Sequence, residues 1–186
     1  MGRKPRIWFP DSFYHIVCRG NRRDALFKDT SDYKIFLHML SEVNKKTPFE
    51  LASYCLMSNH FHLQLRSQEQ HISKVMSLLN KRYADYYNTK NNLSGHVFEK
   101  RYFDKAIDSN FGLLDVSRYI HLNPVKAGIV EKPESYRWSS YRYYLHTTHH
   151  KLIDFNHILK HFTGNELEKR EKYQQFTEDK STKIGV

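Results

Sequence analysis

The sequence is poor in cysteine and has no long apolar run. The only cysteines, Cys18 and Cys55, lie far apart, so they predict neither a disulfide scaffold nor a cysteine-rich zinc site. No apolar stretch approaches the roughly 20 residues that span a bilayer. The basic residues 1–7 are not followed by the apolar segment of a signal peptide. These absences predict a cytosolic protein in a reducing compartment, without a membrane partner.

Acidic residues are also in short supply. The 186 residues include 30 Lys and Arg against 20 Asp and Glu, for a net charge of +10. This excess favours a polyanionic partner, because Lys and Arg that contact phosphates release counterions. Aromatic residues reach 15%, with 13 Tyr and 12 Phe, and a basic, aromatic composition is typical of proteins that bind single-stranded nucleic acid. A basic, tyrosine-rich surface without a binding role is the alternative that composition leaves open.

Residues 54–66 alternate between apolar and polar side chains, as a strand does. Side chains two apart on a strand project from the same face, so we expect His60 and His62 to project together. Two imidazoles on one face are good ligands for a divalent metal, but a His-x-His pair alone is a weak signal. The apolar positions that we expect on the opposite, buried face are Cys55, Met57, Phe61, Leu63 and Leu65.

The rest of the pattern predicts further strands and helices. We expect strands at residues 12–18 and 49–58, at the histidine segment, and within residues 95–107. Ser58 and Asn59 are either a tight turn or part of one long strand. Helices are expected from Asp29 to before Pro48, over residues 72–87, and over residues 111–122. The polar residues 88–92 would end the second helix. For the third, Asn110 is the expected cap and Pro124 the expected end.

This order of elements predicts an α+β fold with a ferredoxin-like antiparallel sheet. The helices would cover one face and leave the face with the histidines free. Residues 1–10 would be a basic N-terminal arm, residues 11–147 the main domain, and residues 148–186 a charged, helical C-terminal extension. Residues 133–145 contain Trp138, which we expect to be packed, and several tyrosines for which packing and base stacking both stay open.

Tyr119 and Asn123 are four residues apart and would share one face of the third predicted helix. The phenolic oxygen and the amide oxygen could then reach the same metal as the histidine pair, and an oxygen-containing ligand set with phosphate suits Mg²⁺ or Mn²⁺. A phenol is a weak nucleophile in neutral water, and a metal that polarises a phosphate eases its attack. The product would be a covalent phosphotyrosine and a free 3′-hydroxyl.

Other candidates for these roles are weaker. Three tyrosines of the second predicted helix are rival nucleophiles by composition, but none is followed by the proline stop that comes five residues after Tyr119; they are Tyr83, Tyr86 and Tyr87. We expect His15 and His96 to be ordinary surface or strand residues. His121 would point away from Tyr119 on a helix.

Two segments resemble motifs of one family. Residues 57–63 resemble the HUH motif of single-tyrosine transposases, and residues 119–128 resemble the catalytic-tyrosine helix of that family. Residues 14–21 and 98–102 are also similar, most of all to REP-associated tyrosine transposases. The resemblance covers roughly residues 10–145. It implies that Tyr119 is the nucleophile, that His60, His62 and Asn123 hold the metal, and that a 5′-phosphotyrosine forms.

The resemblance also implies a substrate and a setting. Single-stranded DNA, often next to a hairpin, is the expected substrate, in the cytosol of a bacterium. Cations expected to contact the DNA backbone are Arg3, Lys4, Arg19, Arg22, Arg23, Lys100, Arg101 and Lys105. A single catalytic tyrosine per chain is compatible with a monomer that uses it twice and with a homodimer, so both stay open. The alternatives are a non-catalytic or domesticated protein that binds hairpins or single strands, and a replication-type nickase, which the small size disfavours.

Overall fold

The computed structural model describes residues 7–147 and 150–179. Its strands are β1 (Tyr14–Arg19), β2 (Glu50–Met57), β3 (His60–Arg66) and β4 (Phe103–Ala106). Its helices are α1 (Thr30–Lys46), α2 (Ile72–Asn91), α3 (Asn110–Lys126), α4 (Tyr141–Leu145), α5 (Asn156–Leu159) and α6 (Glu166–Glu178), with 3₁₀ turns η1 (Asn21–Arg23) and η2 (Pro133–Ser135). Within these ranges no helix is long and apolar enough to cross a membrane.

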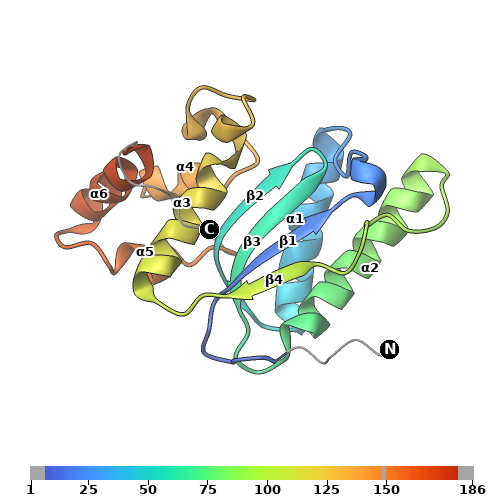
Figure 1. Cartoon of the computed structure of the whole chain (residues 1–186), viewed down its shortest axis with the longest axis horizontal. Coiled ribbons are helices and arrows are strands. Elements are labelled where there is room, and N and C mark those ends of the chain that lie inside the picture. Colours follow the sequence, from blue (N-terminus) through green and yellow to red (C-terminus); the bar gives the residue numbers. More distant parts are fainter. Residues whose placement is uncertain (1–6, 148–149, 180–186) are drawn as a thin grey trace.

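The strands form one antiparallel sheet in the order β2-β3-β1-β4. With the chain order β1-α1-β2-β3-α2-β4, this is the ferredoxin-like arrangement, so the predicted α+β fold is confirmed. α1 and α2 pack side by side against one face of the sheet (Figure 1). Their apolar stripes are buried there: Phe36 of α1, for example, contacts Phe61 of β3 and Tyr83 of α2.

Residues 58–59 form the tight turn between β2 and β3, which is one of the two alternatives that the sequence left open. Across this hairpin Met57 pairs with His60, and Cys55 pairs with His62. Residues paired directly across antiparallel strands project from the same face. Cys55 and Met57 therefore share the face of the histidines, and their predicted place beside the apolar residues of β3 was wrong. A two-residue turn reverses the parity of the alternation, which the sequence pattern does not reveal.

The face that carries the histidines is covered along β2 and β3, although the sequence predicted it to be free. α3 lies across this face and packs against both strands (Figure 1). Ile120 of α3 joins Cys55 and Met57 in a small buried cluster. His62 is only 3% exposed. Helices thus occupy both faces, because an apolar sheet face must be buried against another layer.

α3 does not end where the sequence predicted. Pro124 lies inside the helix, which continues to Lys126. A proline removes one hydrogen bond to the preceding turn of a helix. Here the carbonyl without a backbone donor is that of Ile120, and the helix continues because α3 packs against β2 and β3. The Asn123 Nδ2 donates to the Tyr119 carbonyl oxygen (3.1 Å). The chain then turns at Gly128, whose φ of 66° is in the left-handed region that favours glycine.

Two other helix boundaries also differ from the prediction. α3 is capped by Ser109 rather than Asn110, because the Ser109 hydroxyl accepts a hydrogen bond in the first turn. α2 continues to Asn91 through the residues that we expected to form a loop. Lys90 in this last turn forms an ion pair with the buried Asp32 of α1 (2.6 Å). This tie between the helices favours the extra turn of α2.

Residues 136–140 and 153–154 cover the outer edge of β2, which would otherwise present unpaired backbone groups. The Leu56 N–H donates to the Trp138 carbonyl oxygen (2.9 Å). The indole of Trp138 stacks on Tyr33 of α1, with ring centroids 4.4 Å apart, so its predicted packing role is confirmed. Buried tyrosines of this region are Tyr136, Tyr141 and Tyr144. Packing is therefore the role of these three side chains.

A buried polar junction joins α6 to α3. The Tyr173 hydroxyl lies 2.6 Å from His121 Nδ1 and 2.7 Å from the Ser117 hydroxyl. The other ring nitrogen of His121 lies 2.8 Å from the Ser140 hydroxyl. Burial lowers the pKa of His121 to about 3, so the imidazole is neutral. Both ring nitrogens have a hydrogen-bond partner. The predicted C-terminal extension therefore packs on α3 through α6, while its boundary at residue 148 stays a prediction.

We expect Tyr173→Phe to lower the free energy of unfolding by about 1–3 kcal/mol, because it leaves Ser117 and one nitrogen of His121 buried without this partner. Urea denaturation measures the change. Gln174→Ala, on the exposed side of α6, is the matched control and should cost within about 0.5 kcal/mol. A loss for Tyr173→Phe no larger than that of the control would contradict the account of the junction.

Candidate active site

Tyr119 of α3 lies against two histidines of the sheet. Its ring centroid is 5.7 Å from that of His62 on β3 and 5.6 Å from that of His15 on β1, and it meets both rings edge to face. The His60 and His62 rings are 5.0 Å apart. The structure therefore brings Tyr119 and the histidine pair together, as the strand and helix spacings predicted. The catalytic roles of these residues stay a prediction.

Each histidine of the pair has one nitrogen held by a neighbour. His62 Nδ1 lies 3.0 Å from His15 Nε2, and His60 Nδ1 lies 2.7 Å from the Asn59 side-chain oxygen. The remaining nitrogen of His62, Nε2, is buried without a hydrogen-bond partner among the described residues. Metal-binding histidines commonly use one nitrogen in this way for orientation and the other as the ligand.

The electrostatic surroundings keep these imidazoles neutral. Burial, and then the charge of Lys105, lower the pKa of His15 to about 4. Burial, and then the charge of Arg19, lower the pKa of His60 to about 4. Burial is also the main reason why the pKa of His62 lies well below its ordinary value. A neutral His15 can accept the Nδ1–H of His62, which leaves a lone pair on His62 Nε2.

The residues present fit a divalent metal held in part by oxygen. The unpartnered Nε2 of His62 and the oriented ring of His60 are suitable nitrogen donors. No three His, Cys, Asp or Glu side chains of residues 7–147 and 150–179 form a metal-binding group, so further ligands would be an amide, a phosphate or water. Asn123 uses the nitrogen end of its amide to bond the Tyr119 carbonyl, and its role as an oxygen ligand stays a prediction.

A cleft of about 450 Å³ opens beside Tyr119 and His62. Four of the predicted DNA-contacting cations line it, namely Arg19, Lys100, Arg101 and Lys105. The lining also includes His15, Val17, Glu99 and Phe103. Positive charge is thus concentrated where the phenol and the imidazoles meet, which suits a phosphate group in the cleft.

The other predicted DNA contacts lie elsewhere. Arg22 and Arg23 are exposed in η1, both with left-handed φ angles (53° and 65°), and Arg22 lines a separate hollow with His96. The structure does not bring these two residues into the cleft. Arg3 and Lys4 lie outside the described residues.

Sequence reasoning missed three neighbours of the site. His15 was expected to be an ordinary strand residue, but it is buried against His62, and only the pairing of β1 with β3 reveals this. Asn59 was assigned to the turn alone. Lys126 places its Nζ 4.7 Å from the centre of the Tyr119 ring. Helical spacing could have identified Lys126, since it follows Tyr119 by two turns.

The rival tyrosines of α2 have other partners. The Tyr83 hydroxyl donates to the Leu26 carbonyl oxygen (2.6 Å), and the Tyr87 hydroxyl donates to that of Ala25 (2.9 Å). The Tyr86 hydroxyl donates to a buried carboxylate of α1. These three phenols serve the packing of α1 and α2, on the opposite face of the sheet from α3.

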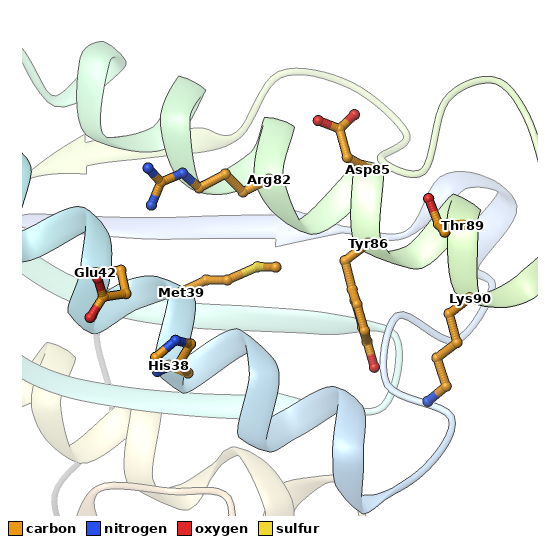
Figure 2. A pocket seen from close by; sticks show the side chains of 8 residues that line it. All are labelled: His38, Met39, Glu42, Arg82, Asp85, Tyr86, Thr89 and Lys90. Atoms are coloured by element: carbon orange, nitrogen blue, oxygen red, sulfur yellow. The ribbon is translucent and has the colours of Figure 1, made fainter.

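A larger hollow, of about 650 Å³, lies between α1 and α2, and Figure 2 shows its lining. Its residues are His38, Met39, Glu42, Arg82, Asp85, Tyr86, Thr89 and Lys90. Opposite charges are mixed along its walls, and none of the predicted site residues lines it. Its size alone therefore does not make it a candidate active site.

Comparisons with known proteins point to one family. The family model described as "Transposase IS200 like" matches residues 9–123. The REP-associated tyrosine transposase of Escherichia coli (strain K12) is 24% identical over 132 residues, which are 70% of this chain and 76% of that protein. A solved REP-associated tyrosine transposase bound to a REP hairpin has the same fold, with a TM-score of 0.66 and 18% identity, covering 83% of this chain and 98% of that one.

The low pKa values of the buried histidines predict acid sensitivity. The unfolded chain takes up protons near pH 6.5, whereas the folded His15 and His60 resist protonation until about pH 4. The folding stability should therefore decrease as the pH falls from about 6.5 to about 4. Urea denaturation at a series of pH values measures this, and His15→Gln should flatten the dependence. A stability that stays level over this range would show that the imidazoles are accessible to protons in the folded protein.

Proposed function

The chain belongs to the IS200-like transposase family, and on that premise we propose that it breaks and rejoins single-stranded DNA through a covalent bond to Tyr119. One observation carries the proposal: Tyr119 meets His62 and His15 at a cleft lined by four cationic side chains. The hairpin in the related solved structure supports a hairpin-bearing strand as the substrate. The candidate nucleophile, one candidate metal ligand (His62) and candidate phosphate contacts thus line one cleft.

Binding precedes the chemistry. Arg19, Lys100, Arg101 and Lys105 neutralise phosphates of the strand and hold its backbone along the cleft. α3 packs against β2 and β3, which fixes the direction of the Tyr119 side chain relative to the bound phosphate. Such positioning is itself a large part of catalysis, since it removes the entropy cost of bringing two groups together.

The cleavage step exchanges one phosphate ester for another. A bond forms between the Tyr119 oxygen and phosphorus while the bond from phosphorus to the 3′-oxygen breaks, and the phenol proton and the proton gained by the leaving oxygen exchange with water. The Lys126 ammonium, 4.7 Å from the ring centre, stabilises negative charge on the phenolic oxygen. The products are a 5′-phosphotyrosine and a free 3′-hydroxyl.

Mg²⁺ or Mn²⁺ is the proposed cofactor. His60, His62 and the oxygen of Asn123 would hold it, and it would supply positive charge beside the scissile phosphate. The chain contributes the orientation of these donors: Asn59 holds the His60 ring, and His15 holds the His62 ring. Loss of either hydrogen bond should weaken metal binding, typically by about 10- to 100-fold.

Rejoining reverses the same step. Because the phosphotyrosine keeps the energy of the original ester, the 3′-hydroxyl of another strand can attack it and release Tyr119. Tyr119 and the histidines meet within one chain, so a monomer carries both halves of the site. A homodimer remains compatible with the same geometry.

Tyr119→Phe tests the nucleophile. We expect this variant to bind a labelled hairpin-bearing oligonucleotide within about twofold of the wild-type affinity, because it keeps the ring and the cleft. It should form no denaturation-resistant protein–DNA band with Mn²⁺, because the attacking oxygen is gone. Tyr87→Phe, on the opposite face of the sheet, should still form the band.

Two results would contradict the proposal. Adducts formed by Tyr119→Phe would show that another residue attacks. Wild-type protein that binds the oligonucleotide but never forms an adduct would instead support the non-catalytic alternative.

His60→Ala tests the metal ligand. The variant should lose adduct formation and most of its Mn²⁺ affinity, because one of two nitrogen donors is removed. Calorimetric titration with Mn²⁺ measures the affinity, and His38→Ala, an exposed histidine of α1, is the control that should leave both properties unchanged. Normal cleavage by His60→Ala, or by the wild type in excess chelator, would refute a metal at this position.

A further inference from the structure

Phe103 is an exposed aromatic side chain in the wall of the cleft. It begins β4, the edge strand beside β1, and 53% of its surface is accessible to solvent. Single exposed apolar residues are common on protein surfaces, so exposure alone means little. Phe103 lines the same cleft as His62 and Tyr119, whereas the other large exposed hydrophobic side chains of the described residues, such as Phe111 and Leu167, do not line it.

The sheet register places Phe103 in one row with His62. Val17 of β1 pairs with Phe103 on one side and with His62 on the other. Paired residues of neighbouring strands project from the same face, and two strand spacings amount to about 10 Å. The ring therefore stands on the face of the histidines, beside the position of the scissile phosphate rather than at it.

Cations flank the ring along its own chain segment. Lys105, two residues further along β4, shares the face of Phe103, since side chains two apart on a strand project together. Arg101, two residues before it, also lines the cleft. An aromatic ring between two cations suits the binding of single-stranded nucleic acid, because bases stack on the ring while backbone phosphates contact the cations.

We propose that Phe103 is a stacking platform for an unpaired base of the bound strand, next to the scissile phosphate. The proposal rests on the proposed function, since it assigns part of the substrate to the same cleft. Arg101 and Lys105 would contact the phosphates on either side of the stacked base. Stacking would fix how far the strand lies along the cleft, and so which phosphate reaches Tyr119. Because every base has a π-face, the platform would accept any base.

Binding measurements on full-length variants test this role. Phe103→Ala should weaken the binding of a single-stranded oligonucleotide by about 5- to 100-fold in fluorescence anisotropy, because base stacking on an aromatic ring is lost. Phe103→Trp should keep the affinity within about threefold, because it restores a ring. Phe111→Ala removes another exposed phenylalanine, from α3 outside the cleft, and should leave the affinity unchanged. Thermal melting of each variant checks that the fold is intact.

An abasic scan of the oligonucleotide identifies the stacked base. For the wild type, removal of one particular base should weaken binding by a factor similar to that of Phe103→Ala. For Phe103→Ala, removal of the same base should have no further effect, because its partner is already absent.

In a cleavage assay Phe103→Ala should also cut at neighbouring phosphates, whereas a merely structural role would reduce all cutting alike.

Failure of the stacking role and failure of the proposed function give different results. If Phe103→Ala binds as tightly as Phe111→Ala, or if every abasic position affects Phe103→Ala as it affects the wild type, the stacking role is overturned while the proposed function stands. If the wild type does not bind single-stranded DNA, both proposals fail together.

Discussion

The contact between His15 and His62 is the constraint on which the site depends. It exists because β1 pairs with β3 in a register that sets Val17 opposite His62 and leaves His15 diagonal to it. His15 Nε2 is then 3.0 Å from His62 Nδ1, and α3 closes over both rings. The direction of the His62 ring and its unpartnered Nε2 follow from this contact, while burial is the main reason why the ring is neutral. A shift of the register by one residue would turn His62 to the other face.

Charge connects the cleft to the histidines. Lys105 and Arg19 line the cleft, and their charges also contribute to the low pKa values of His15 and His60. In the proposed function the same cations would attract phosphates, and together with burial they lower the pKa values of the imidazoles. Phosphates that neutralise these cations remove part of that effect, although burial, the larger cause, remains. Affinity for a polyanion and the availability of the nitrogen donors therefore depend on one set of side chains.

Local periodicity predicted what lies within one element of structure. The alternation of β3 put His60 and His62 on one face, helical spacing put Tyr119 and Asn123 together, and the order of elements gave the sheet. The rest depends on pairing between distant segments. The reversed parity of Cys55 and Met57, the burial of His15 and the cover that α3 provides are consequences of tertiary contacts. Pro124 misled for another reason: α3 packs along β2 and β3, and the loss of one hydrogen bond does not end a helix held by such contacts.

The junction between Tyr173 and His121 has a consequence for synthesis of the protein. Domains begin to fold from their N-terminal side while the chain is still being made. The sheet with His15, His60 and His62, and then Tyr119, leave the ribosome well before Tyr173 does. Until α6 emerges, His121 and Ser117 lack the hydroxyl that joins them. A nascent chain therefore carries all the candidate catalytic side chains before it has Tyr173, the residue that bonds α3 to α6.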